Sequence, residues 1–165
     1  MTMSLAAQTA GLVTRANKTD PLPNIGTEIN QAVNRIKCVW DFAVLGGAIS
    51  SINMLDDQGN TATLPKGAVV TSALAYVVTA PVGASGTIGF SLLGTSDLMA
   101  QTAITSLTIG VLWQAVPVLP GAAASFTTLV GPVTAAGGSI VKVKIATTAQ
   151  TAGKIILFLD YLDIN

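Results

Sequence analysis

Histidine is absent from this chain of 165 residues, and cysteine occurs only once. Without histidine the chain has no Ser-His-Asp or Cys-His catalytic site and no imidazole ligand for zinc. A single cysteine forms no intrachain disulfide, and Cys38 lies in an apolar segment, which is typical of a small core residue. We therefore expect no enzymatic activity, no cofactor and no metal site.

Charge is also scarce, at 10% of residues, where a typical soluble domain has about 25%. Lys+Arg 8 balance Asp+Glu 8, so the formal net charge is +0. A neutral chain lacks the long-range attraction on which nucleic-acid and anionic-membrane binders depend, and it lacks the self-repulsion that keeps monomers apart. We expect neither nucleic acid nor a membrane as partner, and we expect the chain to assemble.

Long hydrophobic runs are missing as well. The most apolar stretches, Ala73–Val78 and Ile155–Leu159, are far shorter than the roughly 20 residues of a membrane-spanning helix. The first residues, Met1 to Gly11, carry no Lys or Arg and are interrupted by polar residues, so we predict no signal peptide.

The few carboxylates offer little for catalysis. We interpret Asp56–Asn60 as a hairpin turn, in which Asp and Asn side chains bond to their own backbone; a weak calcium loop is the alternative, although the EF-hand spacing is missing. Asp160 and Asp163 need not share a face of a strand, and we interpret them as solvated. A hydrolase built on a carboxylate pair is a remote alternative.

What the chain has instead is alternation of apolar and polar residues from Arg35 onward. The clearest strand is predicted from Ile36 to Val44, ended by Gly46-Gly47. Further strands are predicted at Ile49–Leu55, Thr61–Leu64, Ala68–Thr79, Thr87–Leu93, Leu107–Trp113, Ser125–Val130, Ser139–Thr147 and Lys154–Ile164. About eight strands separated by short turns predict an all-β fold, an antiparallel β-sandwich of jelly-roll type.

Three details of this pattern are specific enough to test. Ala68–Thr79 has apolar residues on both faces, which predicts a central strand buried on both sides. Lys142 and Lys144 alternate with Val141, Val143 and Ile145, which predicts protection of a sheet edge. Ser96 or Asp97 is a candidate cap for a short helical turn through Leu98–Ala103.

The segment before the first strand differs in composition, so we divide the chain into an N-terminal arm, residues 1–34, and a β-sandwich domain, residues 35–165. The arm contains the breaker Asp20–Pro23 and is expected to be extended or partly helical. Candidate contacts with partner subunits come from the basic residues around the arm and from one aromatic residue in an irregular stretch, which is interpreted either as core or as a contact anchor. They are Arg15, Lys18, Arg35, Lys37 and Trp113.

A family resemblance rests on several stretches of the sequence. They are Leu64–Thr71, the valine-rich strand up to Ala80-Pro81, Gly86–Phe90, Thr95–Ala100, and Thr151–Lys154 leading into Leu159–Leu162. These stretches resemble small virion structural proteins of tailed bacteriophages. The resemblance implies a jelly-roll or β-sandwich module on the capsid exterior, made in the host cytoplasm. It implies a decoration or cement protein that binds the major capsid protein of the same virion, assembles as a homotrimer and stabilises the head.

One alternative within the virion is a receptor- or glycan-binding module of a phage fibre or tail. It requires an exposed group of aromatic side chains, for which Trp40, Trp113, Tyr76 and Tyr161 are the candidates. Trp40 lies between the apolar Cys38 and Phe42 in the predicted strand, so we assign it to the core.

Overall fold

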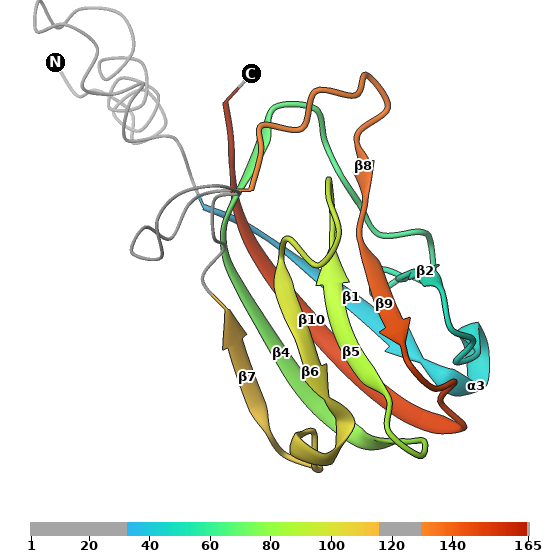
Figure 1. The fold of residues 1–165 in the computed structure, drawn as a ribbon. Coiled ribbons are helices and arrows are strands. Elements are labelled where there is room, and N and C mark those ends of the chain that lie inside the picture. Colours follow the sequence, from blue (N-terminus) through green and yellow to red (C-terminus); the bar gives the residue numbers. More distant parts are fainter. Residues whose placement is uncertain (1–32, 116–129, 165) are drawn as a thin grey trace, which may run out of the picture. The chain divides into compact units, whose positions relative to one another are not determined.

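The computed structural model describes residues 33–115 and 130–164 of the chain. Within these ranges the strands form two four-stranded sheets and one two-stranded sheet, and every strand pair is antiparallel (Figure 1). The predicted all-β, antiparallel sandwich is confirmed. Of the predicted arm, only the last two residues lie within the described ranges, and the first strand begins at Asn34.

Sheet 1 has the strand order β1-β10-β4-β7. Its strands are β1 (Asn34–Asp41), β10 (Ala152–Asp163), β4 (Ala68–Val82) and β7 (Leu112–Ala115). Sheet 2 has the order β2-β9-β5-β6, with β2 (Ser51–Asn53), β9 (Lys142–Ala146), β5 (Thr87–Ser91) and β6 (Met99–Ala103). The two-stranded sheet pairs β3 (Thr63–Leu64) with β8 (Ser139–Ile140), and two short helices, α3 (Phe42–Leu45) and the 3-10 helix η1 (Ile104–Ser106), complete the described elements.

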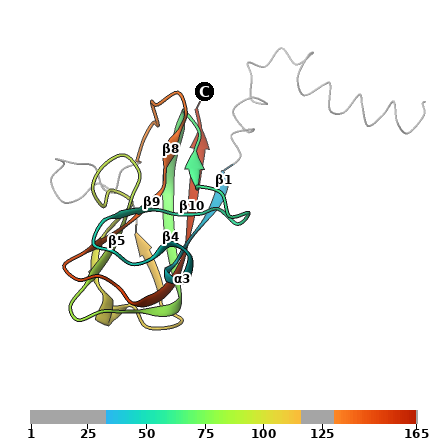
Figure 2. The ribbon, with the colours of Figure 1, turned by 90° about the vertical axis from the view of Figure 1, so that its right-hand side faces the viewer.

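The chain passes repeatedly between the two sheets. From sheet 1 it crosses to sheet 2 after β1, returns at β4, crosses to β5, returns at β7, crosses to β9 and returns at β10. Among the described strands of sheets 1 and 2, only β5 and β6 follow each other within one sheet. Figure 2 shows the two sheets as two layers. Because of these crossings, the first and last strands of the described chain lie side by side in sheet 1.

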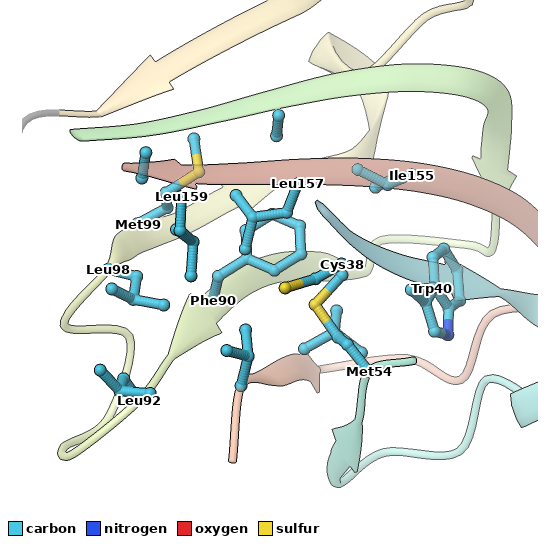
Figure 3. Close-up of a cluster of buried hydrophobic side chains, with 14 of the residues drawn as sticks. Cys38, Trp40, Met54, Phe90, Leu92, Leu98, Met99, Ile155, Leu157 and Leu159 are labelled. Carbon is cyan, nitrogen blue, oxygen red and sulfur yellow. The ribbon is translucent and has the colours of Figure 1, made fainter. Parts of the chain in front are cut away.

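Apolar side chains from both sheets fill the space between the layers. Cys38, Phe90 and Leu157 are fully buried, and Figure 3 shows Phe90 of sheet 2 and Leu157 of sheet 1 in one cluster of buried side chains. Burial raises the pKa of the Cys38 thiol to about 12, with a further contribution from the charge of Asp56. The predicted core role of Cys38 therefore agrees with an unreactive, protonated thiol.

Trp40 is also fully buried, as predicted, and its indole N–H donates a hydrogen bond to the Gly46 carbonyl at 3.0 Å. The strand ends sooner than predicted, however, because Asp41 caps α3 and accepts a hydrogen bond from the Ala43 N–H at 3.0 Å. Phe42 and Val44 were therefore wrongly assigned to this strand. Asp is among the best residues for capping a helix, and here capping overrides the apolar alternation.

Strand β4 is buried on both faces only at its start, over Ala68–Val70. Beyond that point Ala73, Ala75 and Val77 are buried, while Tyr76 on the other face is 37% exposed. The prediction of burial on both sides is therefore wrong for the rest of the strand. The residues on the second face are apolar, but no described element covers them.

Two further predictions are corrected by the strand order. Strand β9 lies between β2 and β5, so Lys142 and Lys144 do not mark a sheet edge. Residues of the predicted helical turn form β6 instead, and the Asp97 carboxylate accepts backbone N–H groups in the preceding loop. These N–H groups belong to Leu92, Leu93 and Gly94, at 2.8, 2.9 and 2.9 Å.

Several of the remaining predictions are confirmed. The turn at Asp56 is confirmed, because its Oδ1 accepts the N–H groups of Gln58 and Asn60 at 2.9 and 2.8 Å. Strands β2, β3, β5 and β9 lie inside their predicted ranges, whereas β7 overlaps its range only at Leu112 and Trp113. The predicted strand at 125–130 lies outside the described residues except for Val130, which bridges to Val70.

Candidate interaction surface

The side of sheet 1 that faces away from the core is largely apolar. Alternation along β10 shows this directly: Ile155, Leu157 and Leu159 are fully buried, while Ile156 and Phe158 between them point the other way and are partly exposed. We call this side the outer face of sheet 1. Its apolar side chains are Val39, Leu74, Tyr76, Leu112, Ile156 and Phe158.

The strand register brings these side chains into two neighbouring rows. One row runs across the sheet through Val39, Ile156, Tyr76 and Leu112. The next row runs through Lys37, Phe158, Leu74 and Gln114. Directly opposite residues in antiparallel strands have Cβ atoms about 4.5–5.5 Å apart, so each row is a continuous contact surface.

An ion pair between β1 and β10 flanks the two apolar rows on each side along the strand direction. At one end the Arg35 guanidinium donates two hydrogen bonds to the Asp160 carboxylate, at 2.6 and 2.9 Å. At the other end Lys154 Nζ lies 2.9 Å from Asp41 Oδ2. In each pair one residue comes from β1 and the other lies directly opposite on β10.

These ion pairs favour the charged forms of Arg35, Asp41 and Asp160. The hydrogen bond from Arg35 and its positive charge lower the pKa of Asp160, and the same hydrogen bond raises the pKa of Arg35. The hydrogen bond from Lys154, with one from the Ala43 N–H, lowers the pKa of Asp41. Asp160 is therefore an ion-pair partner rather than the simply solvated carboxylate expected from the sequence.

The outer side of sheet 2 has different chemistry. Lys142 and Lys144 of β9 alternate with the fully buried Val143 and Ile145. Beside them, the Gln101 side chain accepts a hydrogen bond from the Thr87 hydroxyl at 2.8 Å and donates to Ser96 Oγ at 3.1 Å. This face is a polar, hydrogen-bonded surface of the kind that faces water.

The predicted contact residues fall into three places. Arg35 and Lys37 both lie on the outer face of sheet 1, where Arg35 pairs with Asp160 and Lys37 lies opposite Phe158. Trp113 is partly buried and packs against the core, with its ring centroid 5.6 Å from that of Phe90. Arg15 and Lys18 lie outside the described residues.

Sequence reasoning missed the apolar centre of the outer face. Leu74 and Tyr76 lie in Ala68–Thr79, which was predicted to be buried on both sides because a strand with apolar residues on both faces is normally covered on both. No prediction assigned a face to Ile156 or Phe158. The signal was present in the two longest strands, β4 and β10, which carry apolar residues at consecutive positions.

A small open hollow of about 230 Å³ lies beside the outer face, between β1, α3 and the turn at Asp56. Its lining mixes Lys37 and Lys154 with Asp41, Asp56 and Asp57. Within residues 33–115 and 130–164, no three Cys, Asp or Glu side chains are grouped so as to hold a metal ion. In the same part of the chain, no helix is long and apolar enough to cross a membrane.

No family model and no curated protein matches the chain. Among solved structures, it is similar to a chain of the "Cyanophage Pam1 capsid asymmetric unit", with 16% sequence identity and a TM-score of 0.48. The match covers 79% of this chain and 84% of that chain. A likeness of this strength assigns no residue role and no partner to the present chain.

Proposed function

We propose that the chain is a non-enzymatic structural protein of a phage virion, a decoration or cement protein that binds the assembled head as an oligomer and stabilises it. The observation that carries the assembly part of this proposal is the apolar outer face of sheet 1, with Leu112 65% exposed and Tyr76 37% exposed. The proposed location on a phage particle comes from the sequence resemblance to small phage virion proteins.

The apolar outer face supports assembly for a simple reason. An antiparallel sheet that faces water normally alternates apolar residues toward the core with polar residues outward. Here two adjacent rows on the outward side are mostly apolar, and contiguous apolar surface of this kind marks a contact with another protein. The net charge of +0 also leaves no long-range repulsion between subunits.

The finer parts of the proposal come from the resemblance and the strand order. The proposed partners are the major capsid protein of the same virion and further copies of the chain, three in the arrangement that the resemblance implies. The proposed location is the capsid surface. A jelly roll is the proposed connection of the eight strands in sheets 1 and 2, supported by the repeated crossing between sheets and by the pairing of first and last strands.

Stabilisation of the head would follow from mass action. A protein that binds the assembled shell and not its separated subunits lowers the free energy of the assembled state by an amount that grows with occupancy. We assign capsid contact to the N-terminal arm, including Arg15 and Lys18, and assign the fold of the sandwich to the residues from Arg35 onward.

The test is binding of the purified chain to assembled heads of the phage that encodes it, stripped of the protein. Co-sedimentation with the heads and a higher temperature of DNA release are expected. A variant without residues 1–23 should keep its far-ultraviolet circular dichroism spectrum and bind heads more weakly. The substitution Lys144→Glu on the polar side of sheet 2 serves as the matched control and should bind normally.

Three results would contradict parts of the proposal. No co-sedimentation with the heads would reject the decoration role. Normal occupancy by the variant without residues 1–23 would reject the arm as the capsid contact. Specific binding to a glycan array without binding to heads would favour the receptor- or glycan-binding module of a fibre or tail instead.

A further inference from the structure

We infer that the outer face of sheet 1 is a contact between two copies of this chain, related by a two-fold axis that lies in the interface and runs across the strands. The proposed function requires assembly, with three copies on the capsid as the resemblance implies, but it does not say which surface the purified chain uses in solution. The two-fold contact belongs to the purified chain, so it can fail or hold independently of capsid binding.

The charges at the ends of the outer face carry the inference. On β1, Arg35 lies at one end and Asp41 at the other, six residues along the strand. On the adjacent β10 the signs are reversed, because Asp160 lies beside Arg35 and Lys154 lies beside Asp41. The face therefore has a positive and a negative group at each end, in opposite order.

A two-fold axis that runs across the strands places each end of the outer face over the opposite end of the same face on the second copy. Arg35 then lies over Asp41 of the second copy, and Asp160 lies over Lys154 of the second copy. By symmetry the same four groups meet at the other end, as an isologous interface requires. Each end becomes a cluster of two cations and two anions with alternating signs.

The apolar rows match under the same operation. The axis passes between the row containing Phe158 and Leu74 and the row containing Ile156 and Tyr76. Phe158 then lies over Ile156 of the second copy, and Leu74 lies over Tyr76 of the second copy. Lys37 falls at the β1 side of the sheet, where its long side chain can extend to solvent.

Packing of two sheets face to face is a standard arrangement. Such sheets lie about 10 Å apart with their strands within about 30° of each other. Four strands about 4.8 Å apart, over the length of β1, make a face of roughly 500 Å² in projection. This is at the small end of protein interfaces, so we expect the pair to dissociate on dilution.

A second copy fits this face better than an unrelated partner does. An unrelated partner needs only a complementary surface of its own and places no constraint on the order of charges here. Self-association does constrain it: the sign at one end must oppose the sign at the other end on the same strand. Both β1 and β10 satisfy this requirement.

The experiment exchanges charges while keeping each ion pair within the chain. The first variant combines Arg35→Asp with Asp160→Arg, so the pair remains but its order is reversed. Like charges then face each other across the two-fold axis, and we expect the dimer dissociation constant to rise by at least about tenfold, since facing like charges are strongly unfavourable.

The second variant adds Asp41→Lys and Lys154→Asp to the first. Both pairs are now reversed, opposite charges face each other again, and we expect the dissociation constant to return toward that of the unaltered chain. The control is Lys144→Glu on sheet 2, which should change nothing. Sedimentation velocity over a dilution series measures all four proteins, and circular dichroism verifies that each is folded.

The expected mass of the unaltered chain is about 33 kDa, twice 16.7 kDa, falling on dilution. A chain that stays monomeric at every concentration overturns the inference. So does a dimer or trimer whose dissociation constant is the same in the first variant, or one that the second variant fails to restore. Binding to phage heads is measured separately, so its outcome bears only on the proposed function.

Discussion

The two sheets present opposite chemistry on their outer sides. Sheet 2 carries Lys142 and Lys144 outward and a hydrogen-bonded Gln101 beside them. Sheet 1 carries Ile156 and Phe158 outward, and its two ion pairs flank the apolar rows along β1 and β10. Both sheets cover the same core, so the core does not require this difference.

The contrast shows how a chain with 10% charged residues distributes its few charges. On sheet 2 the outward lysines keep the outer face hydrated. On sheet 1 four charges form two ion pairs and Lys37 lies on the edge strand β1, which leaves the middle of the face apolar and available to a partner. A protein that was selected only to fold and stay soluble would have little reason to treat its two faces differently.

The largest expected effect is a difference in folding stability between removing a phenylalanine from the core and removing one from the outer face of sheet 1. Phe90→Ala removes a fully buried ring and should lower the free energy of unfolding by about 3–5 kcal/mol. Phe158→Ala removes a partly exposed ring that points outward and should cost about 1 kcal/mol or less at protein concentrations where the chain is monomeric. Urea unfolding measures both, and equal losses would contradict the assignment of Phe158 to an outer face.

The next effect is on association rather than on folding. Replacing Ile156 and Phe158 together by Thr keeps residues that suit strands and makes the outer face of sheet 1 polar. We expect a folded protein whose self-association is weakened by at least about tenfold, since removing apolar contacts from the centre of an interface typically costs more than 1 kcal/mol. Light scattering measures the change; undiminished association would place the contact elsewhere.

The corresponding change on sheet 2 should affect folding slightly and association not at all. Gln101→Ala removes hydrogen bonds to Thr87 and Ser96, and we expect a loss of about 1 kcal/mol in the free energy of unfolding. The native mass should stay unchanged. A drop in native mass would show that sheet 2, and not sheet 1, carries the contact.

The smallest effect concerns pH. The pKa values of Asp41 and Asp160 are lowered in the folded chain, by their hydrogen bonds to Lys154 and Arg35 first. A carboxyl group whose pKa is lower when folded contributes stability above its unfolded pKa of about 3.9, and this contribution is lost as pH falls through the folded pKa.

Between pH 6 and pH 3 the unaltered chain should therefore lose more stability than the variant carrying Asp41→Asn and Asp160→Asn. The difference should be small, because exposed ion pairs contribute little. Urea unfolding at both pH values and low protein concentration measures it. Identical losses in the two proteins would show that neither pair stabilises the folded chain.

The fold class was predictable from the sequence because alternation of apolar and polar residues is a local property. Strands such as β5 and β9 follow from it, and so does the turn at Asp56, whose side chain bonds to its own backbone. The errors at Asp41 and Asp97 have one cause in common. In both places a side-chain carboxylate accepts hydrogen bonds from the backbone, and these bonds determine the local structure.

The candidate surface was predictable only in part. Arg35 and Lys37 were identified as contact residues, but their partner strand β10 is more than a hundred residues away in sequence, and nothing local indicates that Asp160 lies opposite Arg35. The outward direction of Phe158 was equally hidden, since an apolar residue looks the same in a sequence whether it faces a core or a partner. Those features depend on strand order and register.

The most direct test of a self-assembling subunit is the native mass of the purified chain, measured by light scattering behind a sizing column over a range of concentrations. We predict a mass near 33 kDa at high concentration that falls on dilution, twice the 16.7 kDa of one chain. A mass near 50 kDa would match the trimer that the resemblance implies and contradict the two-fold pairing. A mass of 16.7 kDa at every concentration would contradict assembly of the purified chain through the apolar face of sheet 1.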